Sequence, residues 1–254
     1  MAAGADGGHS PIAQFELKTL VPIKLFGFDA SFTNSSAFMI LATGAVAAFL
    51  MYAMSNRALV PTRLQSVAEM IYEFVANTVR ENVGEAGMKF FPLVFSLFIF
   101  VLVLNLFGMI PGGFTVTSHI IITAAMALLV ISIVIAYGFS QHGIGFLKLF
   151  VPSDVPAWLL FFMVPIEIIS FISRPITLSV RLFANMLAGH IALKIFGGFV
   201  GTLAFAGGWA LLAPLPLALT ISLTALEFVV AVLQAYVFAV LTCIYLNDAV
   251  HGAH

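Results

Sequence analysis

Five long apolar segments make up most of this chain, and their lengths restrict the fold more than any other feature. Three are close to the roughly 20 residues that an α-helix needs to span a bilayer. The other two would be about 66 Å and about 57 Å long as single helices, whereas the hydrocarbon core is about 30 Å thick. We therefore expect these two to be steeply tilted, bent or partly interfacial. In chain order the segments are residues 37–54, 90–110, 116–137, 155–199 and 209–246.

Composition excludes a water-soluble fold. Hydrophobic residues make up 62% of the chain and charged residues 8%, against about 25% charged residues in soluble domains. The predicted fold class is an all-α integral membrane protein, with an N-terminal arm at residues 1–36 and one membrane domain at residues 37–254. Pro165 and Pro175 offer bends in the fourth segment, and the glycine-rich residues 197–208 predict a hairpin turn before the fifth. The net charge of −1 gives no indication of a nucleic-acid partner.

Residues 61–85 have a different pattern from the apolar segments. Apolar residues recur at helical spacing from Leu64 to Val75, and Arg63 and Glu69 lie between them. This pattern predicts an amphipathic helix or hairpin along the membrane surface. An ordinary helix in a cytoplasmic loop fits the periodicity equally well.

The distribution of lysine and arginine indicates the orientation of the chain. Arg57, Arg63, Arg80 and Lys89 flank the first connection, whereas residues 111–115 contain neither residue type. Cytoplasmic connections carry an excess of both. We therefore predict that the N-terminus lies outside and that the C-terminus, after five crossings, is cytoplasmic.

Polar residues inside the two longest segments point to an ion path. Arg181 lies deep within residues 155–199, where a cation costs about 3 kcal/mol on insertion scales and needs a partner. Glu167, Arg174 and Arg181 are spaced by seven and so share one helix face. Two polar stripes exceed what helix association needs, which favours a hydrated path over a packed polar interface. The fourth segment also carries Ser170, Thr177 and Asn185 near this face, and the fifth carries Thr220, Glu227, Gln234 and Tyr245.

Three stretches of the sequence resemble the subunit a family of F-type ATP synthases, the stationary membrane subunits beside a rotating c-ring. RPITLSVRLFANMLAGH at residues 174–190 resembles the family signature, LQAYVFAVLTCIYL at 233–246 its last helix, and residues 92–111 its second span. The resemblance extends from about Val60 to Asp248. It implies a strongly tilted two-helix hairpin that packs against the rotor ring. It also implies a subunit that is not itself catalytic for ATP, and the sequence has no GxxxxGK[ST] loop.

The resemblance also implies roles for individual residues. Arg181 is expected to face the carboxylate of each passing c subunit and to separate two offset half-channels, because a fixed cation favours the deprotonated carboxylate and arginine stays charged. A purely structural pair between Arg181 and a carboxylate is the alternative, and Arg174 is expected to pair with Glu167 or lipid headgroups. The expected outer-side half-channel contains Asn185, His190, Glu227 and Gln234, extended by His119 and Asn105. The expected cytoplasmic half-channel contains Glu167, Ser170, Ser173 and Thr177.

One departure from the family concerns His190 and Glu227. Many bacterial members carry a carboxylate at the first position and a histidine at the second, and here the two are exchanged. If these side chains face each other, the exchange keeps one acid and one imidazole in the same channel. The pair favours H⁺ over Na⁺ as the translocated ion. His119 and Asn105 fit a structural hydrogen-bonding role as well as a channel role.

The same resemblance also implies the partners, cofactors and cellular location of the chain. The expected partners are the c-ring, b-type subunits of the peripheral stalk, the remainder of the F1F0 complex and the lipid bilayer. No cofactor and no metal are expected. The expected location is a bacterial inner membrane rather than the energy-transducing membrane of an organelle.

Three other functional classes fit the sequence less well. A secondary transporter would show internal repeats and broken helices, and no clear repeat is present. An intramembrane hydrolase would need HExxH or a placed serine and histidine, and the nearest approach, Ser140 with His142, falls in a predicted loop. A haem or quinone subunit would need histidines paired across facing spans, for which His119 and His190 are a poor case.

Overall fold

The chain folds as a multi-pass helical membrane protein. The computed structural model describes residues 17–22, 24–25, 28–29, 31–55, 61–110, 113–151, 157–205 and 211–251. Within these residues, five helical segments are long and apolar enough to cross a membrane, which confirms the predicted fold class. They contain α1 (Asn34–Ala53), α3 (Phe91–Gly108), α4 (Ile120–His142), α5 (Ala157–Ala204) and α6 (Pro214–His251).

Four short strands precede the first membrane helix. β1 (Thr19–Val21) pairs antiparallel with β4 (Phe32–Thr33), and β2 (Lys24–Leu25) pairs antiparallel with β3 (Phe28–Asp29). The Thr33 hydroxyl then caps α1 by accepting a hydrogen bond from the backbone N–H of Ser36. The first helix therefore begins at Asn34 rather than at residue 37. Residues 1–16 of the predicted arm lie outside the described residues.

The amphipathic segment is a single helix, α2 (Arg63–Val83), capped at its start by Thr62. One face buries Val75 and Val79 against α3 and α6, while Met70 on another face is exposed. Gly84, at a φ of +79°, ends α2 and leads into the 3-10 helix η2 (Glu85–Phe90). A helix with one packed face was predicted here, and its position at the membrane surface stays a prediction.

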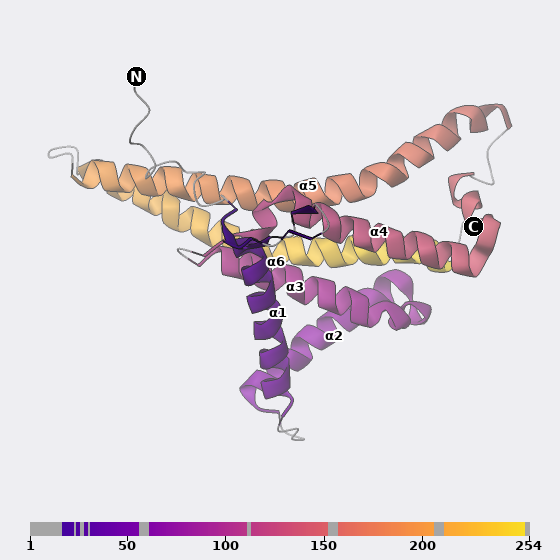
Figure 1. Cartoon of the computed structure of the whole chain (residues 1–254), viewed down its shortest axis with the longest axis horizontal. Coiled ribbons are helices and arrows are strands. Elements are labelled where there is room, and N and C mark those ends of the chain that lie inside the picture. Colours follow the sequence, from indigo (N-terminus) through magenta and orange to yellow (C-terminus); the bar gives the residue numbers. More distant parts are fainter. Residues whose placement is uncertain are drawn as a thin grey trace.

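α5 and α6 are long and antiparallel, and α5 bends along its length (Figure 1). α5 has 48 residues with Pro165 and Pro175 in its interior, and α6 has 38. The predicted turn does not begin at Gly197, because α5 continues through Gly197, Gly198 and Gly201 to Ala204. The rest of the predicted turn, with Gly207 and Gly208, lies outside the described residues. In a bilayer the need to satisfy backbone hydrogen bonds outweighs the low helix propensity of glycine.

Two 3-10 helices, η3 (Val116–Ser118) and η4 (Gly143–Phe150), lie at the two ends of α4. The loop predicted around Ser140 and His142 is wrong, because both residues belong to the last turn of α4. A serine and a histidine two residues apart on a helix point in different directions. This geometry removes the nearest approach to a hydrolase site.

α6 lies at the centre of the packing and contacts α2, α3, α4 and α5. Ala231, Ala235, Ala239 and Cys243 recur every four residues and are at most 2% exposed, so small side chains let the neighbouring helices approach closely. Half of the residues in an 18-residue apolar stretch of α6 are buried, against 11% of the residues in a comparable stretch of α5. α5 therefore presents a large apolar surface outward.

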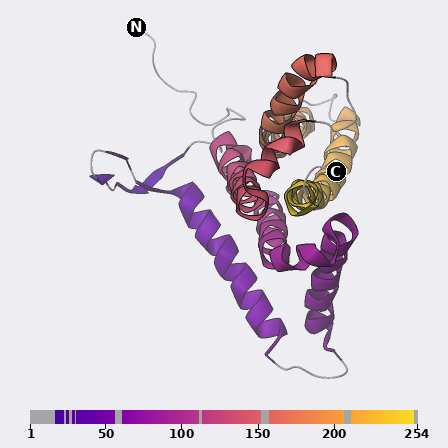
Figure 2. The same cartoon turned by 90° about the vertical axis from the view of Figure 1, so that its right-hand side faces the viewer.

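α1 stands apart from α5 and α6 (Figure 2), and it packs mainly on α3. Its direction runs across that of α5 and α6 (Figure 1). Because α1 has 20 residues, the length of one crossing, this arrangement agrees with a strong tilt of the two longest helices.

Candidate ion path between α5 and α6

Polar side chains of α5 face polar side chains of α6 at three levels. His190 pairs with Glu227, Asn185 bonds to Gln234, and Arg174 pairs with Asp248. Residue numbers rise along α6 as they fall along α5, as expected for antiparallel helices. Of the residues predicted for the two stripes, Asn185 and Gln234 meet directly, whereas Glu227 and Arg174 pair with His190 and Asp248, which were not assigned to either stripe.

The His190–Glu227 pair is buried, with 8% and 5% of the two residues exposed. Nε2 of His190 lies 2.8 Å from the carbonyl oxygen of Gly108. Because a carbonyl oxygen can only accept, Nε2 carries a hydrogen and Nδ1 is the ring nitrogen that faces Oε1 of Glu227. One proton can then be shared between Nδ1 and the carboxyl group, an arrangement suited to proton relay.

Gly189 provides the space that Glu227 occupies. A Cβ atom at this position would lie 2.9 Å from Oε1 of Glu227, closer than side chains normally approach. The absence of a side chain at Gly189 therefore allows the carboxyl group to reach His190 on the same turn of α5. This role could not be recognised from the sequence, because nothing there shows which residue fills the space beside a helical glycine.

A cavity of about 330 Å³ adjoins the His190–Glu227 pair. Lys194 and Thr224 contribute polar groups to its lining, and the end of α3 forms another wall. The buried pair therefore borders a cavity whose lining is partly polar. Its lining residues are Gly108, Met109, Ile110, Gly113, His190, Leu193, Lys194, Thr220, Thr224 and Glu227.

Asn185 and Gln234 continue the polar line from the cavity toward Arg181. Nδ2 of Asn185 donates to Oε1 of Gln234 at 3.1 Å. Gln234 is 4% exposed, and its Nε2 has no partner among the described residues. Buried polar atoms without a protein partner are uncommon and call for a functional explanation.

Arg181 lies one helical turn from Asn185 on an exposed face of α5. Its neighbours Leu178 and Leu182, at 1% and 0% exposure, point into the core instead. No hydrogen bond or ion pair of Arg181 is found among the described residues. The structural pair with a carboxylate, considered from the sequence, is therefore absent from the described part of this chain.

Arg174 is the centre of a second polar group, which lies in the interior of α5 on the N-terminal side of Arg181. Its Nη1 lies 2.6 Å from Oδ2 of Asp248, and its Nη2 lies 3.8 Å from Oε1 of Glu167. The Ser173 hydroxyl donates to the carbonyl oxygen of Ser170, and the Thr177 hydroxyl donates to that of Arg174. These two hydroxyls thus use their hydrogens within α5 and retain only acceptor capacity toward a path.

Asp248 was missed by the sequence reasoning, which ended the last apolar segment at residue 246. A signal was available, because Asp248 continues the seven-residue spacing of Thr220, Glu227 and Gln234. The expected pair between Arg174 and Glu167 is present, but Asp248 is the nearer partner.

Apolar packing separates the two polar groups within the chain. Leu178 and Leu182 of α5 and Phe238 and Leu246 of α6 belong to one core cluster and are at most 1% exposed. Thr242 is also buried, and its hydroxyl donates to the carbonyl oxygen of Phe238. Among the described residues, this part of the contact between α5 and α6 is thus closely packed and mostly apolar.

Asn105 and His119 lie outside the lining of the 330 Å³ cavity. Asn105 is fully buried and donates to the carbonyl oxygen of Ala231, which ties α3 to α6. The ring of His119 stacks on Phe114 with centroids 5.2 Å apart, and burial lowers its pKa. Their extension of the outer-side path stays a prediction.

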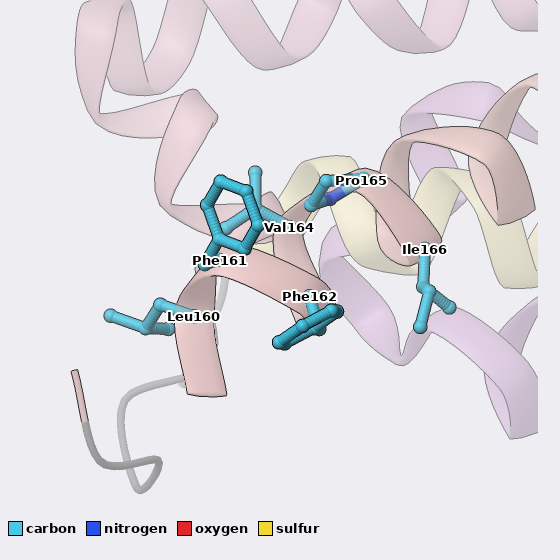
Figure 3. Close-up of a pocket in the computed structure, with 6 residues that line it drawn as sticks. All are labelled: Leu160, Phe161, Phe162, Val164, Pro165 and Ile166. Carbon is cyan, nitrogen blue, oxygen red and sulfur yellow. The ribbon is translucent and has the colours of Figure 1, made fainter. Parts of the chain in front are cut away.

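Another cavity, of about 580 Å³, lies near the start of α5 and has an apolar lining (Figure 3). A lining without ionisable or hydrogen-bonding side chains cannot pass protons, so we do not place the path there. Among the described residues, no group of three or more His, Cys, Asp or Glu side chains could hold a metal ion. The large cavity is lined by Leu160, Phe161, Phe162, Val164, Pro165 and Ile166.

Comparison with known proteins identifies the family. Residues 36–247 match the model of the ATP synthase A chain family. The chain is 62% identical to ATP synthase subunit a of Mesorhizobium japonicum, covering 96% of this chain and 97% of the relative, and 61% identical to that of Allorhizobium ampelinum, covering 97% and 99%. It is 60% identical to the subunit a of Rhizobium meliloti, covering 97% and 99%. The chain therefore belongs to the ATP synthase A chain family.

Proposed function

We propose that the chain is the stationary proton-channel subunit of an F-type ATP synthase. It gives the carboxylates of a rotating c-ring access to the two sides of the membrane through two offset half-channels, and Arg181 separates them. Proton passage is thereby coupled to ring rotation and ATP synthesis. The chain itself carries out no phosphoryl transfer.

An interrupted line of polar groups along α5 and α6 supports this proposal most strongly. From the 330 Å³ cavity the line runs through His190–Glu227 and Asn185–Gln234 to Arg181. The second group, around Arg174, lies beyond a packed apolar core. This packing favours proton passage from one group to the other across the outer face of α5, where a carrier on another subunit would move.

The charge of Arg181 explains how the two paths stay separate. A guanidinium with no ion pair in the described chain can attract a deprotonated ring carboxylate and favour proton loss as each site arrives. The same charge repels hydrated protons, which opposes direct leakage. Arginine fits this role because its pKa above about 12 keeps it charged where lysine could deprotonate.

The cytoplasmic path is the less enclosed of the two. Glu167, about one third exposed, would receive protons near the start of α5, with Ser170, Ser173 and Thr177 beside it. Since two of the hydroxyls donate to their own helix, this path would run between α5 and the ring. The N-terminus would lie outside and the C-terminus in the cytoplasm of a bacterial cell, in keeping with the bacterial relatives.

Exposed apolar residues of α5 and α6 support contact with a ring. Val180, Ile176, Leu226 and Val229 are each more than 40% exposed, and they belong to the helices that form the polar line. Family membership supports the c-ring, the b-type subunits and the remaining F1F0 subunits as partners. The histidine–carboxylate pair favours H⁺ over Na⁺ as the ion.

Cysteine cross-linking within the assembled complex tests which face the ring covers. We expect Val180→Cys to form cross-links to c subunits, because this residue is exposed beside Arg181. Ile40→Cys, equally apolar and 64% exposed but on α1, is the matched control and should give none. The native Cys243 is fully buried and should not react. Cross-linking from α1 but not from Val180→Cys would contradict the proposed ring position.

A substitution at Gly189 tests the geometry of the outer-side path. Gly189→Ala should displace the Glu227 carboxyl group, break its contact with His190 and slow ATP-driven proton pumping on the order of tenfold. Gly197→Ala is the control, since no atom would lie within 4 Å of its new Cβ. Both variants should assemble. Equal pumping by both variants would show that the position of the Glu227 carboxyl group does not affect proton pumping.

A further inference from the structure

We propose that Asp248 is a positioning residue that neutralises Arg174, so that ring carboxylates meet the charge of Arg181 and not that of Arg174. This inference rests on the proposed function. It assigns Asp248 a task other than carrying protons, and it explains why two arginines can share one face of α5.

The contacts of Arg174 reduce the positive charge that it presents at the outer face of α5. Asp248 holds Nη1 at 2.6 Å and Glu167 lies 3.8 Å from Nη2, so one guanidinium faces two carboxylates. Its Cζ atom also lies 5.6 Å from the centre of the Tyr245 ring. The Arg174 and Asp248 side chains are each 26% exposed. Arg181 has no comparable partner among the described residues.

The separation of the two arginines makes this neutralisation necessary. Seven residues of helix place them about 10 Å apart along the axis. Charges interact over this distance in a low-dielectric medium. During ATP-driven pumping a ring carboxylate must take up a proton on the cytoplasmic side, near Arg174. An unpaired Arg174 would stabilise the deprotonated form there and oppose proton uptake.

Asp248→Asn in the complete ATP synthase removes the charge while preserving shape and hydrogen-bonding capacity. We expect ATP-driven acidification of inverted vesicles to fall about tenfold at neutral pH. Arg174 then keeps only the more distant Glu167 as a carboxylate partner among the described residues, so its charge is less fully neutralised and lowers the pKa of a nearby carboxylate by about one unit. Pumping should recover at a cytoplasmic-side pH about one unit lower.

The double variant Arg174→Gln with Asp248→Asn tests most directly whether Asp248 acts by neutralising Arg174. Removing both charges should restore pumping and return the pH profile to that of the wild type, even if the single variant fails to assemble. A double variant as slow as Asp248→Asn, or one that does not pump, would overturn the inference and make Asp248 a proton carrier or an essential tie between helices.

Arg181→Ala, measured in the same vesicles, separates the two proposals. Pumping by Arg181→Ala would contradict the proposed function itself. Loss of pumping in Arg181→Ala, together with no rescue in the double variant, would overturn the inference about Asp248 alone. The rate of proton pumping is divided by the rate of ATP hydrolysis of the soluble catalytic part at each pH. The pH dependence of ATP hydrolysis then does not affect the comparison.

Discussion

Arg181→Ala is expected to reduce ATP-driven proton pumping by at least a factor of about a hundred. The electrostatic stabilisation of a charged intermediate by one fixed group is typically of this size. Without the guanidinium, a ring carboxylate has no fixed charge to favour its deprotonation as it passes from one half-channel to the other. The measurement is ATP-driven acidification of inverted membrane vesicles.

Ser179→Ala is the matched control for Arg181→Ala. Ser179 is on the same helix, is 4% exposed and donates its hydroxyl hydrogen to the carbonyl oxygen of Ile176. Its loss should change pumping less than twofold, because the hydroxyl takes no part in the polar line. Normal pumping by a fully assembled Arg181→Ala complex would show that Arg181 is structural and would remove the proposed mechanism.

The second large effect is expected at the buried histidine–carboxylate pair. Glu227→Gln should slow pumping on the order of a hundredfold, because an amide cannot relay a proton and general acid–base groups contribute about this much. The exchange variant, His190→Glu with Glu227→His, should recover most of the lost activity, because it again places one acid beside one imidazole. Both variants are measured by the same acidification assay.

The single variants provide the comparison for the exchange. His190→Glu alone would bring two carboxyl groups together, and Glu227→His alone would bring two imidazoles together. Both should pump more slowly than the exchange variant, since the residues are in contact and their effects should not add. An exchange variant that is no better than either single variant would mean that the pair does not act as one relay.

The sequence predicted the parts of the fold that the bilayer dictates. The five apolar segments, their approximate limits and the excess length of the last two follow from the thickness of the membrane and from backbone hydrogen bonding. Helix ends were less accurate, as at Gly197 and Gly198, where α5 continues into the predicted turn. The short strands before Asn34 were not predicted, because elements of two or three residues are too short for an alternating pattern to stand out.

The candidate site was predictable to the extent that it follows helical spacing. The seven-residue period placed Glu227 and Gln234 on one face, and antiparallel packing brings them to His190 and Asn185. Contacts to backbone could not be predicted in this way. The carbonyl oxygen of Gly108, which fixes the ring nitrogen of His190, has no side chain to mark it in a sequence.

Passive proton leak through vesicles stripped of the soluble catalytic part tests the central claim most directly. If Arg181 separates two half-channels, Arg181→Ala vesicles should leak protons at least as fast as the wild type while failing to pump, and adding Glu227→Gln should lower the leak by closing the outer-side path. A leak in Arg181→Ala that falls to the level of vesicles without the complex, with the subunit fully assembled, would contradict the account.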